Sequence, residues 1–114
     1  MKTVLTLEDR KRARVVEIRT GVVRLRMELS EYGRMHGGSF LLFGSAATGR
    51  IHYDSDVDIL VDFDSSAVAA AVDFAEAACA RLKLTADVQP KSWCKEPFIN
   101  KIAQSAVELP AAVI

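Results

Sequence analysis

The chain of 114 residues has few cysteines, no long apolar segment and no excess of charge of either sign. Its two cysteines, Cys79 and Cys94, do not have the spacing of a CxxC metal motif, so we expect both to be reduced thiols. No apolar run approaches the roughly 20 residues of a membrane-spanning helix, and the first residues lack the apolar stretch of a secretory signal. We therefore expect a cytoplasmic protein that does not bind a membrane.

The charges cancel overall but are unevenly distributed. Fifteen Lys and Arg balance fifteen Asp and Glu, so net charge gives no argument for nucleic-acid binding, and we expect none. Residues 1–36 hold nine basic residues against five acidic ones, whereas residues 37–65 hold only Arg50 against five aspartates. The basic stretch fits either a docking surface for an acidic partner or nucleic acid, or a solvated helix face, and interspersed glutamates favour the solvated face.

Apolar spacing predicts a helix over about residues 7–35, because apolar side chains recur there at steps of three and four between Thr6 and Gly37. The apolar run at 40–43 and the alternation at 57–63 predict two strands. The other expected elements are a helix capped by residues 64–66, a strand at 84–89, a helix with Pro97 in its first turn and an edge strand at 106–109.

Together these elements predict a single domain over residues 1–114, because no linker, repeat or low-complexity tract interrupts them. The expected class is α/β (α+β). A long N-terminal helix precedes a core at about residues 39–109, in which a small mixed β-sheet has helices packed mainly on one face.

Acidic residues stand at and inside the strand predicted at 57–63. Side chains alternate along a strand, so Asp56 and Asp58 share a face and lie about 6.6 Å apart along it. If helices cover the other face, Asp87 of the next strand joins them. Three carboxylates on one open face repel one another until a cation enters, and oxygen ligands favour Mg²⁺ or Mn²⁺.

A glycine and a serine follow the strand predicted at 40–43. Gly44 has no side chain to obstruct a ligand, and Ser45 offers a hydroxyl and a backbone N–H. If residues 46–48 form a helical turn, its free N–H groups attract anions. The pair alone indicates little more than a turn, but with two aspartates at a fixed distance it indicates a phosphate site beside a metal site.

These residues match a known pattern. Gly44 and Ser45, followed after ten residues by Asp56-Val57-Asp58, resemble the GS-x10-DxD signature of the DNA polymerase β-like nucleotidyltransferase superfamily. The segment GSAATGRIHYDSDVDILV looks like its minimal nucleotidyltransferase branch. The resemblance is close over residues 40–63 and extends through TADVQP and PFINKIAQSAVEL, which implies the nucleotidyltransferase fold.

The resemblance implies nucleotidyl transfer with two metal ions. In such a site Asp56 and Asp58 coordinate two Mg²⁺ ions, Asp87 completes the site beside the nucleophile, and Gly44 and Ser45 hold the β and γ phosphates of ATP. For Asp87, the alternative of a solvated residue near a strand end stays open.

The resemblance also implies a partner. Minimal nucleotidyltransferases commonly act as antitoxins of HEPN-domain ribonuclease toxins, and the implied activity is AMPylation of a tyrosine hydroxyl on the toxin. Two alternatives remain: inhibition of the toxin by binding alone, and nucleotidyl transfer to a small molecule. The small size of the chain disfavours the latter, because such enzymes usually carry another domain for the acceptor.

Three further residues have more than one interpretation. Thr48 stands where many relatives have Arg, and either Arg50 replaces that arginine or it is a solvated loop residue. His52 lies in the same loop, and we expect it to be exposed rather than bound to a nucleotide. Trp93 could stack on a base or anchor a partner, but we favour a hydrophobic plug over a helix end.

Overall fold

The computed structural model describes residues 6–111, in which four strands form one mixed sheet with the order β3-β2-β1-β4. The elements are α1 (Leu7–His36), β1 (Ser39–Phe43), α2 (Ser45–Thr48), β2 (Val57–Asp62), α3 (Val68–Arg81), β3 (Ala86–Pro90), the short 3-10 helix η1 (Lys91–Trp93), α4 (Glu96–Ala103) and β4 (Val107–Leu109). Strand β1 is antiparallel to β2 and β4, whereas β2 and β3 are parallel. The expected small mixed sheet is confirmed.

Helix α1 starts and stops at the signals in its sequence. The Thr6 hydroxyl accepts a hydrogen bond from the Asp9 N–H, the Asp9 carboxylate accepts one from the Thr6 N–H, and both distances are 3.1 Å. The helix ends where Gly37 adopts a left-handed conformation with φ of 73°. Among the described helices, none is both long and apolar enough to cross a membrane.

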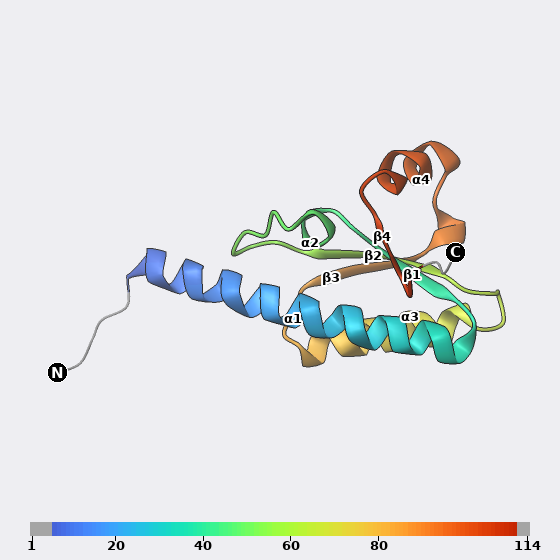
Figure 1. Ribbon diagram of the computed structural model, residues 1–114, viewed down its shortest axis with the longest axis horizontal. Helices are drawn as coiled ribbons and strands as arrows, with labels where there is room; N and C mark the ends of the chain where they lie inside the picture. The colour runs from blue at the N-terminus through green and yellow to red at the C-terminus, as the bar shows by residue number, and fades with distance from the viewer. Residues whose placement is uncertain (1–5, 112–114) are drawn as a thin grey trace.

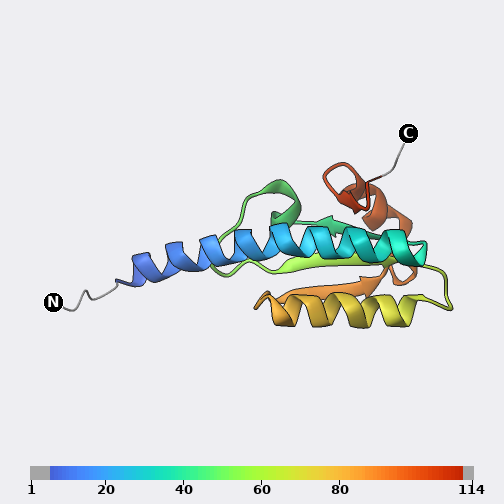
Figure 2. The same ribbon diagram turned by 60° about the horizontal axis from the view of Figure 1, so that its bottom comes forward.

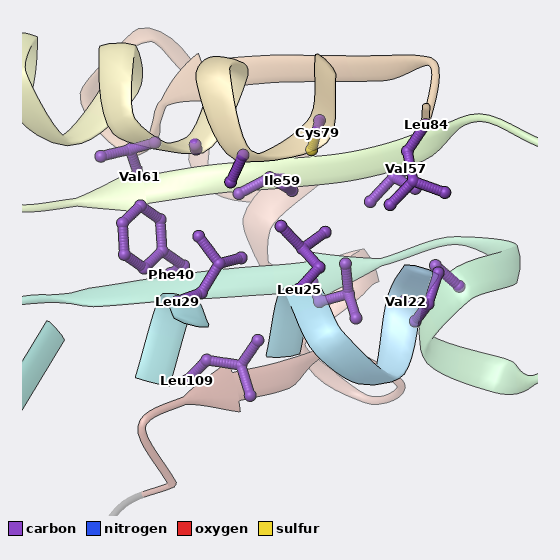
Figure 3. Packing of buried hydrophobic residues seen from close by; sticks show 14 of the residues in the cluster. Val22, Leu25, Leu29, Phe40, Val57, Ile59, Val61, Cys79, Leu84 and Leu109 are labelled. Carbon is purple, nitrogen blue, oxygen red and sulfur yellow. The ribbon is translucent and has the colours of Figure 1, made fainter. Parts of the chain in front are cut away.

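Helices α1 and α3 cover one face of the sheet, as Figures 1 and 2 show. The main core lies between these helices and the sheet (Figure 3). Its completely buried side chains include Leu25 and Leu29 of α1, Phe40 of β1 and Ile59 of β2. Cys79 of α3 belongs to this core and Cys94 is partly buried, and both are free thiols.

Helix α4 lies on the other face of the sheet (Figure 1). Its Phe98 meets Phe43 of β1 edge-on, with ring centroids 5.7 Å apart. Leu60, which alternates with the core residues of β2, is only 1% exposed although it lies outside the main core. The face expected to be open is therefore open only in part, and accessible carboxylates remain where β2 begins.

Two elements begin later than the sequence predicts. Helix α3 starts at Val68, whose N–H donates to the Asp64 carbonyl at 2.9 Å, so a turn rather than a side-chain cap leads into the helix. Strand β3 starts at Ala86, because the Leu84 N–H still donates to the Cys79 carbonyl at the end of α3, at 2.8 Å. Neither shift changes the face on which Asp87 lies.

Candidate functional site

Strands β2 and β3 place Asp58 and Asp87 next to each other. The two residues are partners in the parallel register, so their side chains project from the same face of the sheet. Asp56 precedes Asp58 by two residues, and an extended chain puts it on that face as well. The register therefore places Asp58 and Asp87 side by side, and Asp56, just before β2, is near enough for its charge to act on Asp58.

The three carboxylates differ in their surroundings. Asp56 and Asp87 are exposed, whereas Asp58 is partly buried between them. Burial raises the pKa of Asp58, and the negative charges of Asp87 and then of Asp56 raise this pKa further. Among residues 6–111 no basic side chain forms an ion pair with Asp58, so this carboxylate lies among like charges, an arrangement that a divalent ion would relieve.

Gly44 lies directly against Asp58. It follows β1 with φ of 73° and ψ of −151°, and a Cβ atom added to it would lie 2.5 Å from Oδ2 of Asp58. Any side chain would therefore collide with the carboxylate as well as strain the backbone. Gly44 and the Asp58 carboxylate thus form one continuous site, whereas the sequence predicted only that the glycine turn and the aspartates would be near each other.

The turn continues into the short helix α2. The N–H groups of Ala47 and Thr48 donate to the Gly44 carbonyl at 3.1 and 3.2 Å, and partly buried Ser45 begins the helix. The Thr48 hydroxyl turns back toward the carbonyls of Gly44 and Ser45, at 3.4 and 3.5 Å. It is thus engaged within α2 and does not provide the contact that an arginine at this position would make.

The loop that joins α2 to β2 rests on α1. Arg19 of α1 donates to the Gly49 carbonyl at 3.2 Å, and the Lys11 ammonium lies 4.7 Å from the centroid of the Tyr53 ring. His52 is exposed, as expected, and Arg50 is exposed in the same loop. A role for Arg50 in place of the missing arginine therefore remains a prediction.

Gln89 is a neighbour of the site that the sequence analysis did not single out. Its Nε2 donates to both carboxylate oxygens of Asp87, at 3.2 and 3.3 Å, and so restricts the orientation of this exposed side chain. The signal was present in the sequence, because Asp87 and Gln89 are two residues apart on one strand and share a face.

The donor set fits a divalent cation by its chemistry, because all three candidate ligands are carboxylates on one face. Within residues 6–111, however, no three Asp, Glu, His or Cys side chains are already grouped as ligands of one ion. A cation would have to draw Asp56, Asp58 and Asp87 closer and take further oxygens from water or a phosphate.

Trp93 lies outside this site. The expected hydrophobic plug is wrong, because the side chain is 76% exposed at the end of η1. It borders a groove between α3 and β3 whose apolar lining includes Val72 and Val88. Neither Trp93 nor this groove contributes to the cluster of aspartates.

Comparison with known proteins identifies the chain at the level of a family. No curated protein matches it. Residues 22–109 match the model of the nucleotidyltransferase domain, a range that contains the whole sheet, the glycine turn and the three aspartates. Domains of this kind generally use a nucleoside triphosphate and a divalent metal ion. The chain belongs to the nucleotidyltransferase domain family.

Proposed function

We propose that the protein is an ATP-dependent, Mg²⁺-dependent adenylyltransferase of the minimal nucleotidyltransferase type, which acts as the antitoxin of a HEPN-domain toxin. The contact of Gly44 with Asp58, beside Asp87, carries the proposal of nucleotidyl transfer, because it joins a potential phosphate site to a carboxylate site. The toxin as acceptor is supported by the sequence resemblance over residues 40–63.

In the proposed reaction, a tyrosine hydroxyl of the toxin attacks the α-phosphorus of ATP, the bond to pyrophosphate breaks, and the hydroxyl proton leaves. Asp56, Asp58 and Asp87 would hold Mg²⁺, which when bound stabilises negative charge on the phosphates and favours ionisation of the hydroxyl. Gly44 lets the triphosphate approach the backbone, and Ser45 offers it hydrogen bonds. Asp87, held by Gln89 on an edge strand, would face the acceptor and receive its proton.

The test is transfer of label from [α-³²P]ATP, with Mg²⁺, to a HEPN-domain protein encoded beside this chain. We expect a labelled HEPN protein and a loss of more than about 100-fold in rate for Asp58→Asn. Asp64→Asn is the matched control, because Asp64 is an exposed carboxylate beyond the end of β2. Absence of transfer with the unmodified protein at high concentration would contradict the enzymatic proposal.

A second candidate function is inhibition of the toxin by binding alone. Two observations favour it: the carboxylates are not already grouped around an ion, and the Thr48 hydroxyl is engaged within α2. In this case Asp58→Asn would still rescue cells that express the toxin. A loss of rescue with unchanged toxin binding would instead favour the enzyme.

A further inference from the structure

Helix α1 has a second apolar line on the side opposite to the core. Val16, Val23 and Met27 are 62%, 62% and 61% exposed, and Thr20 lies between them on the same line. These positions follow steps of four, three and four residues, as do the core positions from Ile18 to Leu29. At about 100° per residue the two lines lie on opposite sides of the helix.

The structure leaves this line uncovered. In Figure 2 helix α1 passes in front of the sheet, and no other element of the described chain lies over its outward side. Single exposed apolar residues are common on protein surfaces, but a line of three along one helix is the pattern of anchors by which amphipathic helices pair. From residue 16 to residue 27 the line is about 16 Å long.

Charges beside the line are asymmetric. On one side Arg12, Arg19 and Arg26 are spaced seven residues apart, are exposed, and form no ion pair within residues 6–111, although Arg19 also donates to the Gly49 carbonyl. On the other side Arg14 and Arg24 pair with Glu17 and Glu28 of α1, and Glu28 also pairs with Arg81 of α3. One edge of the apolar line is therefore a row of arginines without acidic partners.

We propose that this surface, the outer face of α1 formed by Arg12, Val16, Arg19, Val23, Arg26 and Met27, docks an amphipathic helix of a partner protein that has acidic residues along one edge. The apolar line would bury the partner's apolar seam, and the arginine row would pair with its carboxylates. Antiparallel docking of a second copy would place arginine row against arginine row. The proposal does not depend on nucleotidyl transfer.

Two designed 21-residue helical peptides test the chemistry of the partner. Both peptides have leucine at steps of three and four residues, which forms one apolar stripe along the helix. The residues on either side of this stripe are all glutamate in one peptide and all lysine in the other. Fluorescence anisotropy measures the affinity of each labelled peptide for the full chain. We expect the glutamate peptide to bind at least about tenfold more tightly than the lysine peptide. Equal binding of the two peptides, or no binding, would overturn the proposal.

Two variants locate the binding surface. Val23→Glu with Met27→Glu should weaken binding of the glutamate peptide at least about tenfold, and so should Arg12→Glu with Arg26→Glu. The control is Ala77→Glu, which adds a charge at an exposed position of α3. Circular dichroism melts establish that each variant is folded. An unaffected affinity, or a dimer of the chain alone that Val23→Glu dissociates, would show that the occupant is not the one proposed.

Discussion

Asp58 is the most constrained side chain of the candidate site. It lies against Gly44 on one side and faces Asp87 on the other, and it is less exposed than either of the other two aspartates. Its pKa is raised by burial and by the neighbouring charges, so the native protein binds a proton there more readily than the unfolded chain does. Ionised Asp58 therefore opposes folding until a cation compensates its charge.

The sign of this effect predicts how stability depends on pH. The raised pKa of Asp58 contributes stability at low pH, and this contribution is lost as the pH rises through that pKa. Asp58→Asn should thus have a melting temperature about 2–4 °C above that of the unmodified protein at pH 7 in EDTA, and the gap should shrink toward pH 4. Thermal unfolding between pH 4 and pH 8 measures this difference in melting temperature, with Asp64→Asn as the control. A gap that is independent of pH would contradict the explanation.

Substitutions at Gly44 and Gly49 can be compared, because both residues have positive φ, of 73° and 80°. Their ψ values differ: 4° at Gly49 is left-handed helical, whereas −151° at Gly44 is a conformation that essentially only glycine adopts. A Cβ atom would also meet Asp58 at Gly44, with nothing within 4 Å at Gly49. Gly49→Ala should cost about 1 kcal/mol, and Gly44→Ala about 1–2 kcal/mol more, because its backbone is more restricted and the carboxylate must move. Urea unfolding measures both.

Removing the Asp58 carboxylate tests whether its contact with Gly44 causes part of the cost of Gly44→Ala. In an Asp58→Ala background the cost of Gly44→Ala should fall, because only the backbone term then remains. If Gly44→Ala costs the same with and without Asp58, the close approach of Gly44 to the carboxylate is wrong.

At the scale of elements, α1 organises the domain. It packs on the sheet through its core line, supports the loop before β2 through Arg19, and is tied to the end of α3 through an ion pair of Glu28 with Arg81. A second pair, with Arg24 of α1, shares the same carboxylate at 3.2 Å. The hydrogen bond from Arg81 is the main cause of the lowered pKa of Glu28, which burial partly opposes.

The lowered pKa of Glu28 gives a second pH-dependent prediction, of opposite sign. Its contribution to stability is present above the unfolded pKa of about 4.5 and is lost as the pH falls through the folded pKa. Glu28→Gln should therefore cost about 0.5–1 kcal/mol at pH 7, and this cost should shrink as the pH falls through the folded pKa of Glu28. Glu31→Gln is the control, since Glu31 pairs with Arg34 on the exposed surface of α1 and, among the described residues, with no residue of α3. Equal effects of the two substitutions in urea unfolding would contradict a role in joining α1 to α3.

At the scale of the whole molecule, the aspartate cluster and the outer face of α1 are two separate surfaces. The chain measures 57 × 28 × 27 Å, because the first turns of α1 extend beyond the sheet (Figure 1). The aspartate cluster lies on the sheet face opposite to α1, and the arginine row lies on the outer side of α1. Nucleotide binding and partner docking can thus be varied separately.

This separation predicts the effect of ligands on the stability of the whole chain. Mg²⁺ with a non-hydrolysable ATP analogue should raise the melting temperature, because a ligand of the native state at 100 times its Kd stabilises by about 2.7 kcal/mol. Either component alone should have little effect, and EDTA should reverse the shift. Asp58→Asn should abolish the shift, whereas Val23→Glu on the outer face of α1 should retain it. A shift that persists in Asp58→Asn would place the nucleotide elsewhere.

The sequence predicts the elements well where the determining interactions are local. The capping box at Thr6, the stop at Gly37 and the alternation along β2 involve residues a few positions apart, so helix and strand follow from spacing alone. Packing does not follow from spacing at Gly21 of α1, which lies outside the steps of three and four: it is buried, and a Cβ atom there would lie 3.1 Å from Leu84.

By itself the sequence determined the class of fold, the long first helix and the candidate aspartates, because alternation and helical periodicity are properties of neighbouring residues. Only the tertiary structure decided that Asp58 pairs with Asp87, that Gly44 touches Asp58, that Leu60 is buried and that Trp93 is exposed. These features depend on strand register and on packing between segments far apart in the chain, where many side-chain arrangements share the same local pattern.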